Sequence, residues 1–207
     1  MADEEYQTFK IILLGDLCVG KTSILLNYVE NKFEESNLST IGVDYMDKII
    51  NYGHEKVKLQ IWDTSGQEKF KSIATNFLRT TDGAFLVFDI TQRITFDNIK
   101  KWLNDVKENN EEVKIIILGN KSDLKHNREV KQDSINAFLE KNNFKYFETS
   151  AKNGTYIEEA FKAMADLLME NETREKINNK RKRGNSILSK NSVISTDEKK
   201  KIVLLMK

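Results

Sequence analysis

A glycine-rich segment at residues 15–22, Gly-Asp-Leu-Cys-Val-Gly-Lys-Thr, has the spacing of a phosphate-binding loop. It follows a short apolar run and opens a segment with helical periodicity. Glycines let the backbone N–H groups turn toward phosphate oxygens, and the amino end of the helix adds partial positive charge. Lys21 then supplies a charge for the β- and γ-phosphates, and the Thr22 hydroxyl supplies a ligand for Mg²⁺. Alone, the segment indicates a nucleoside di- or triphosphate, and an ordinary glycine turn is the alternative.

The segment at 120–123, Asn-Lys-Ser-Asp, has side chains suited to guanine. A carboxylate such as Asp123 accepts two adjacent N–H bonds, which guanine offers on N1 and N2 and adenine does not. Asn120 suits the base N7 and ties loops together, and the Lys121 stem suits the base plane. Backbone N–H groups of 149–152, Thr-Ser-Ala-Lys, would meet the guanine O6. A polar loop of turn-forming residues is the alternative for 120–123 alone, but its pairing with the phosphate loop favours a guanine nucleotide.

Residues 62–68, Trp-Asp-Thr-Ser-Gly-Gln-Glu, have the side chains of a γ-phosphate sensor. Asp63 is placed to hold Mg²⁺ through its water shell, and the Gly66 N–H to contact the γ-phosphate. Gln67 is placed to orient the attacking water, because phosphoryl transfer depends mainly on positioning and electrostatics. Thr40 would add a second hydroxyl ligand to Mg²⁺.

Phe33 follows the first predicted helix, where an aromatic edge would cover the base; a core position is the alternative. The predicted catalytic residues are Gln67, Lys21 and Gly66, and the predicted metal ligands are Thr22, Thr40 and Asp63. The predicted nucleotide-binding residues are Gly15, Asp16, Leu17, Cys18, Val19, Gly20, Lys21, Thr22, Ser23, Phe33, Thr40, Gly66, Asn120, Lys121, Asp123, Ser150, Ala151 and Lys152.

Strand-like and helical patterns alternate along the chain, which predicts an α/β fold with a doubly wound, mostly parallel sheet. Several runs are apolar throughout, as in strands covered on both faces. Each motif follows a predicted strand, and ligands of such sheets bind at the carboxyl ends of the strands. The expected strands are 9–14, 43–51, 57–63, 83–88, 113–118 and 145–147, and the expected helices are 21–31, 96–107, 134–139 and 157–168.

Composition limits the class of protein. The 207 residues are 39% apolar and 31% charged, which is enough for a globular core. One cysteine, Cys18, excludes an internal disulfide and a cysteine-cluster zinc site. The start is acidic and polar, unlike a signal peptide, and no apolar run reaches the roughly 20 residues of a membrane span. We therefore expect a cytoplasmic protein.

The net charge of +1 conceals an acidic body and a basic tail. Residues 174–207 hold 11 Lys or Arg and 3 acids, a net charge of +8, so residues 1–173 carry −7. The tail lacks a helical period and is rich in Asn, Ser and Lys, which predicts disorder. We expect a folded domain over 1–173 and a tail that contacts anionic membrane weakly and reversibly on its cytosolic face. A solvated tail without a membrane contact is the alternative.

These motifs together resemble the small Ras-like GTPases over about residues 8–170, and within them the Rab branch. The Rab resemblance rests on 41–45, 58–62 and 68–73. It implies a P-loop NTPase G domain with a six-stranded sheet and about five helices, and a slow GTP/GDP switch in membrane traffic. It also implies effectors, exchange factors and activating proteins that bind the switches, with Ile41, Trp62 and Phe70 at effector positions.

The chain departs from the Rab pattern in four places. Leu17 and Cys18 replace small residues, Ser65 replaces an alanine, and 77–81 read Phe-Leu-Arg-Thr-Thr. The sequence ends without a cysteine for prenylation, so stable lipid anchoring is not expected. Leu17 prompts a second hypothesis, a GTP-binding adaptor with impaired hydrolysis. A nucleic-acid module is a third, prompted by the basic 180–183, but no aromatic-rich basic face accompanies it and no nucleic-acid partner is expected.

Overall fold

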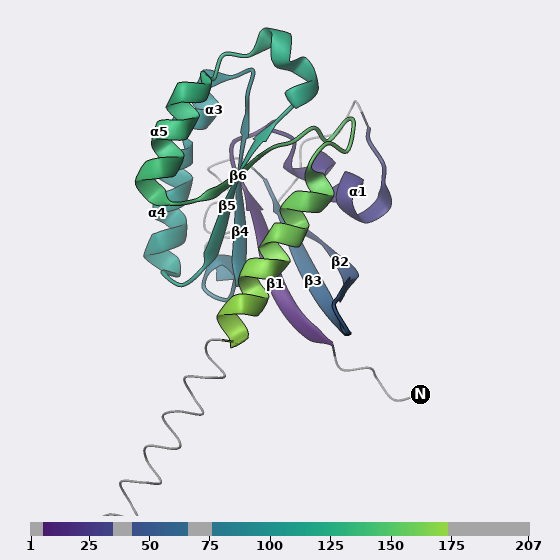
Figure 1. The fold of residues 1–207 in the computed structure, drawn as a ribbon. Helices are drawn as coiled ribbons and strands as arrows, with labels where there is room; N and C mark the ends of the chain where they lie inside the picture. Colours follow the sequence, from purple (N-terminus) through teal and green to yellow (C-terminus); the bar gives the residue numbers. More distant parts are fainter. Residues whose placement is uncertain (1–5, 35–42, 66–75, 174–207) are drawn as a thin grey trace, which may run out of the picture. The chain divides into compact units, whose positions relative to one another are not determined.

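Six strands form one sheet in this computed structural model, which describes residues 6–34, 43–65 and 76–173 (Figure 1). The order across the sheet is β2-β3-β1-β4-β5-β6, and every neighbouring pair is parallel except β2 and β3. The predicted α/β fold with a mostly parallel sheet is therefore confirmed. The strands are β1 (Gln7–Leu14), β2 (Val43–Tyr52), β3 (Glu55–Thr64), β4 (Gly83–Asp89), β5 (Lys114–Asn120) and β6 (Lys145–Glu148).

The antiparallel pair is a hairpin with a two-residue connection. Tyr52 pairs with Glu55, and Gly53 between them has a φ of 61°, in the left-handed region that glycine adopts without strain. β2 is consequently an edge strand, while β4 in the middle of the sheet is buried at all seven positions.

The helices connect the parallel strands. α3 begins at Arg93, earlier than the apolar pattern indicates, and the Arg93 N–H donates to the distant Glu129 carboxylate at 2.9 Å. The single helix expected over 96–107 is two helices separated at Asn98. The helices of the described residues are α1 (Lys21–Glu30), a helical segment over 76–78, α3 (Arg93–Asp97), α4 (Ile99–Asn109), the 3-10 helix η2 (Ser122–Asn127), α5 (Gln132–Asn142) and a helix over 157–173.

Apolar side chains fill both faces of the sheet. On one face, Tyr28 of α1 stacks on Phe161 with ring centroids 3.7 Å apart, and Phe161 also contacts Phe85 of β4. On the other face, α3, α4 and α5 pack over Phe88 and its neighbours in the buried cluster. Figure 1 shows these two helical layers on either side of the sheet. The chain divides into two compact units, residues 1–168 with the sheet and residues 169–207. The predicted domain boundary after residue 173 stays a prediction.

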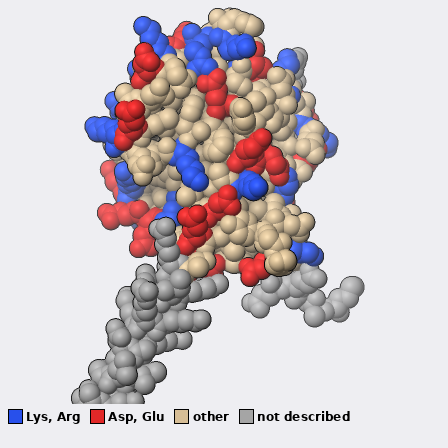
Figure 2. Space-filling model, viewed as in Figure 1, with Lys and Arg blue, Asp and Glu red and all other residues tan. Residues whose placement is uncertain are grey.

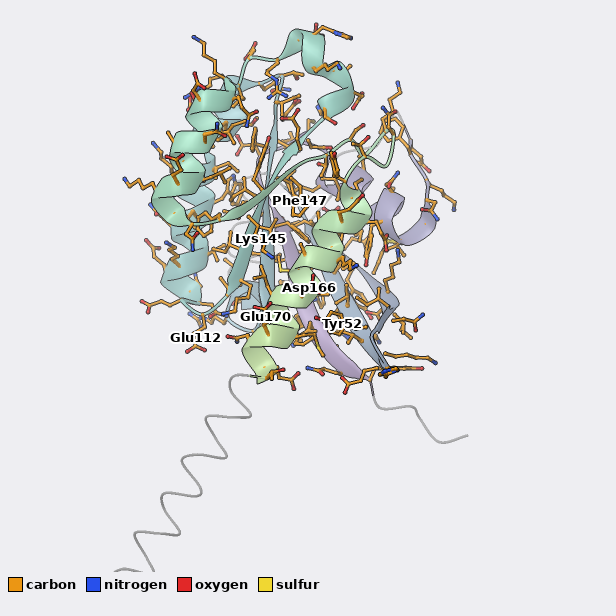
Figure 3. All side chains as sticks on the ribbon, in the orientation of Figure 1. Tyr52, Glu112, Lys145, Phe147, Asp166 and Glu170 are labelled. Carbon is orange, nitrogen blue, oxygen red and sulfur yellow. The ribbon has the colours of Figure 1, made fainter. Side chains whose placement is uncertain are left out.

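The two ends of the sheet differ in what they carry. Tyr52 and Glu112, labelled in Figure 3, mark the end at which β3 and β5 begin. The opposite end, where β1, β3, β5 and β6 finish, carries every motif of the predicted site that the structure describes. Acidic and basic side chains are interspersed on the face shown in Figure 2. Among the described residues, no helix has the length and apolar character needed to cross a membrane.

Candidate functional site

The loop between β1 and α1 requires glycine at both of its ends. Gly15 has a φ of +146°, and a Cβ there would lie 2.1 Å from the Val87 carbonyl oxygen. Gly20 has a φ of +96°, and a Cβ there would lie 2.3 Å from the Asn120 amide nitrogen. Any side chain at either position would collide with a neighbouring strand or loop, so the two glycines allow the tight turn that the phosphate-loop spacing predicts.

Lys21 lies inside this loop. Its ammonium donates to the carbonyl oxygens of Gly15 at 3.0 Å and Asp16 at 2.8 Å, and the residue is 5% exposed. Burial lowers the pKa of Lys21 from 10.5 to about 8, although the nearby Asp63 carboxylate opposes the shift. The loop therefore holds a sparsely hydrated cation, which suits the capture of a phosphate chain.

Two oxygen ligands for a divalent cation meet beside the loop. The Thr22 hydroxyl donates to an Asp63 carboxylate oxygen at 2.5 Å, and Asp63 is 1% exposed. A hydroxyl and a carboxylate are hard oxygen donors of the kind that Mg²⁺ prefers. The residues present therefore fit the predicted metal site, in which Thr22 would ligate directly and Asp63 through water.

The three loops that follow β1, β5 and β6 are joined by one side chain. The Asn120 amide nitrogen donates to the Val19 carbonyl at 2.9 Å, within the phosphate loop. Its amide oxygen accepts from the Thr149 hydroxyl at 3.3 Å and from the Ala151 N–H at 3.2 Å. Asn120 therefore ties the loops together, which is one of the two roles that the sequence suggested.

Asp123 is oriented by the last of these loops. The Ser150 hydroxyl, which is fully buried, donates to one Asp123 carboxylate oxygen at 2.6 Å. The Ser122 N–H donates to the Thr149 carbonyl at 3.0 Å, which fixes the backbone beside Asp123. Because both ends of the loop are held, the half-buried carboxylate has a defined direction for recognising a pair of N–H donors.

The remaining predicted residues lie around this arrangement. Leu17 and Phe33 are exposed at 41% and 38%, and Cys18 is exposed with a φ of 61°, a left-handed conformation that is unusual for cysteine. Val19 and Ala151 are buried, Ser23 is half-buried in α1, and Lys152 is exposed. The residues Thr40, Ile41, Gly66, Gln67 and Phe70 lie outside the described part of the chain.

Trp62 belongs to an aromatic group that the sequence motifs did not reveal. Its ring lies 4.9 Å from that of Tyr45 on β2 and 4.5 Å from that of Phe77. Beside it is a pocket of about 230 Å³ lined by Lys10, Trp62, Asn76, Phe77, Thr80 and Thr81. The hairpin register pairs Tyr45 with Trp62, so the contact between these two rings could be predicted once the strands are paired correctly. Phe77 comes from a separate segment, and its contact could not be predicted in this way.

Sequence reasoning missed the partners that hold two of the predicted residues, Asp16 and Ala151, in place. Asp16 accepts from the Asn98 amide at 2.6 Å and from the Trp102 indole N–H at 2.8 Å. The Asn27 amide on α1 donates to the Ala151 carbonyl at 3.0 Å. These contacts join residues more than 80 positions apart in the chain, and no local pattern signals them.

Comparisons with known proteins agree with this arrangement. The model of the Ras family matches residues 10–170. Ras-related protein Rab-13 of Canis lupus familiaris is 39% identical over 171 residues, covering 82% of this chain and 84% of the relative. The Bos taurus protein of the same name is 38% identical over 181 residues, covering 86% and 89%. The Rattus norvegicus protein is 38% identical over 171 residues, covering 82% and 84%. The chain therefore belongs to the Ras family of small GTPases, which hydrolyse GTP, and is related to the Rab proteins.

Proposed function

We propose that this GTPase is a Rab-type switch whose loops after β1, β3, β5 and β6 bind GDP or GTP together with Mg²⁺. The observation that carries the proposal is that β1, β3, β5 and β6 finish at one end of the sheet, where Asn120 joins three of the following loops and Thr22 contacts Asp63. This proximity supports a site in which partners for phosphate, metal and base would lie next to one another.

Different residues of the site have different roles in GTP hydrolysis. Lys21 balances charge on the β- and γ-phosphates, and Gln67 orients the water that attacks the γ-phosphorus. The Gly66 N–H contacts the γ-phosphate and so couples its presence to the segment that follows β3. A bound Mg²⁺ would neutralise phosphate charge, with Thr22, Thr40 and Asp63 as its protein partners. Because GTP hydrolysis would be slow, the protein would act through the lifetime of its GTP-bound state.

The nucleotide preference is tested by competition against a fluorescent GDP. Unmodified protein should prefer GTP and GDP to ATP because of Asp123. Asp123→Asn turns one acceptor into a donor, so guanine should lose about 1–3 kcal/mol of binding free energy. Xanthine, with an oxygen in place of the N2 amine, should bind relatively better to the variant. Equal affinity for ATP and GTP in the unmodified protein would refute guanine specificity.

A Rab-type role in membrane traffic is supported by the 38–39% identity to Rab-13 proteins over most of the chain. Effectors, exchange factors and activating proteins would bind the switch segments, with Ile41, Trp62 and Phe70 among the contacts. The test is live imaging of tagged protein in cells. Gln67→Leu, which lacks the group that orients water, should accumulate on vesicles, whereas Thr22→Asn, with a weakened metal site, should not. The same diffuse distribution for both variants would argue against this role.

One observation favours a variant of this function in which stimulated hydrolysis is weak. Leu17 projects a branched side chain at the surface of the phosphate loop, where it is 41% exposed. An activating protein that inserts an arginine toward the γ-phosphate would meet it. The adaptor hypothesis is decided by single-turnover hydrolysis with a Rab-activating protein: Leu17→Ser should raise the stimulated rate, and an unchanged or lower rate would count against crowding.

A further inference from the structure

Asp89, the last residue of β4, is a fully buried carboxylate that none of the predicted functions uses. One oxygen accepts from the Thr91 N–H at 2.8 Å and the Thr91 hydroxyl at 2.7 Å. The other accepts from the Gln92 amide at 3.2 Å and forms an ion pair with the Lys121 ammonium at 2.7 Å. A buried carboxylate is costly unless it is paired, and the partner for this charge lies directly after the neighbouring strand β5.

The local hydrogen bonds do not explain why the residue is charged. Thr91, two positions after Asp89, donates its N–H and its hydroxyl to one oxygen, and an asparagine oxygen could accept both of these bonds. The Gln92 amide donates to the other oxygen, and it could turn over to accept from an asparagine NH₂ group. Only the Lys121 contact requires a negative charge. That contact crosses from β4 to β5, where Asp89 is the register partner of Asn120. The charge is therefore used between strands, next to the loop that we assign to the base.

Both partners of the ion pair are held in place. The Thr95 hydroxyl accepts from the Asp89 N–H at 3.0 Å, and its proton lies within reach of the Gln92 carbonyl at 2.7 Å and the Asp89 carbonyl at 3.2 Å. Lys121 follows β5 directly, with its backbone in the left-handed region at a φ of 67°. Its ammonium is anchored at Asp89, so the four methylene groups between the two fixed ends have little freedom. The Lys121 side chain is 29% exposed, which leaves part of that stem open to a ligand.

We propose that Asp89 is a positioning residue of the guanine site: its pairing with the Lys121 ammonium holds the lysine stem in place as a wall against the plane of the base. The inference rests on the proposed function, because it takes 120–123 as the base-binding loop. Asp89 acts through Lys121 and does not contact the nucleotide. Without the anchor, the flexible stem samples other rotamers, and the bound base loses one wall of its site.

The test is a double-mutant cycle on the dissociation rate of fluorescent GDP from the full chain in Mg²⁺. Asp89→Asn keeps the turn and removes the charge, and Lys121→Met keeps an apolar stem and removes the ammonium. Each should speed dissociation about tenfold, the lower end of the loss seen when a group that orients a metal ligand is removed. The double variant should be no faster than the faster single variant. Asp97→Asn, at an exposed acid of α3, is the matched control and should match the unmodified protein.

Two results would overturn the inference. The first is a double variant whose dissociation is faster by the product of the two single effects, since that would mean the residues act independently. The second is an Asp89→Asn variant whose GDP dissociation constant rises by the same factor as its single-turnover rate of GTP hydrolysis falls. A base-site role should affect the dissociation constant much more, because Asp89 acts through the base-binding loop and not through Lys21 or Gln67, which we assign to the γ-phosphate.

If thermal melting shows that Asp89→Asn does not fold, the dissociation rate of GDP is compared in two variants of Lys121 instead. Lys121→Arg keeps a charge for Asp89 and should stay within a few-fold of the unmodified protein, while Lys121→Met should not. Equal losses in these two variants would overturn the inference. Failure of the unmodified protein to bind GDP at all would instead refute the proposed function, so the two failures are distinguishable.

Discussion

At the scale of single residues, Lys21 should make nucleotide affinity depend on pH. Burial lowers the pKa of its free ammonium to about 8, and bound phosphates would raise it again. Binding should therefore take up a proton above pH 8, and affinity should be constant below pH 8 and fall by up to about tenfold per unit above it. Calorimetry of GDP binding in buffers of different ionisation enthalpy measures that proton. Binding at pH 8.5 without proton uptake would contradict the prediction.

Two neighbouring hydroxyls at the end of β3 should have opposite effects on stability. Ser65 is 6% exposed, and its hydroxyl has no hydrogen-bond partner within the part of the chain that the structure describes. The buried Thr64 hydroxyl donates to the Leu13 carbonyl at 2.7 Å. Ser65→Ala should raise the free energy of unfolding by about 1 kcal/mol, and Thr64→Val should lower it by a similar amount.

Thermal melting of the GDP-bound protein checks this pair, with a shift of roughly 2–4 °C for each kcal/mol in a domain of this size. A lower melting temperature for Ser65→Ala would mean that its hydroxyl gains a partner when nucleotide is bound. Such a result would mean that Ser65, which replaces an alanine of the Rab pattern, contributes to the nucleotide site.

At the scale of elements, the phosphate loop is held against the α3–α4 junction by Asp16. The Trp102 indole N–H donates to it at 2.8 Å, so Trp102→Phe removes one charge-assisted hydrogen bond and keeps most of the packing. We expect the free energy of unfolding to fall by about 1.5–3 kcal/mol and GDP dissociation to become several-fold faster. Stopped-flow dissociation and melting measure the two effects, and Lys100→Ala, at an exposed position on α4, is the control. Unchanged dissociation would show that the loop is held without this contact.

At the scale of the whole molecule, the sheet and its loops should fold and bind nucleotide without the basic tail. A chain ending at residue 173 should bind GDP as tightly as the full chain. In both chains, GDP at about 1,000 times its dissociation constant should add about 4 kcal/mol to stability. Melting curves with and without GDP test this domain boundary. A shorter chain with weaker GDP stabilisation would place part of the domain within 174–207.

The same two chains test the function expected of the tail. Only the full chain should co-sediment with vesicles that contain phosphatidylserine, because residues 174–207 carry a net charge of +8. Binding should disappear with neutral lipid and weaken steeply with salt. A full chain that stays in the supernatant at low salt would mean that the tail does not tether the protein to lipid.

The sequence alone determined the identity and chain order of the nucleotide motifs and the α/β class of the fold. The spacing in 15–22 and the residue types in 120–123 are local, because a phosphate loop and a base-recognising carboxylate each need adjacent residues. Apolar runs such as 83–88 likewise fix a buried strand without knowledge of its neighbours. The strand ends were less certain: β3 extends from Glu55 to Thr64, beyond the apolar pattern, because its pairing with β2 stabilises the ends.

Only the tertiary structure decided which residues support the site. The bonds of Asp16 with Trp102 and of Asn27 with Ala151, and the ion pair of Asp89 with Lys121, join residues distant in the chain. A polar residue type has many possible partners, and the sheet order selects among them by bringing particular strand ends together. The split between α3 and α4 lies at Asn98, whose side-chain amide donates to the distant Asp16 at 2.6 Å. Local chemistry is encoded by neighbours in sequence, whereas the rigidity that makes this chemistry selective comes from neighbours in space.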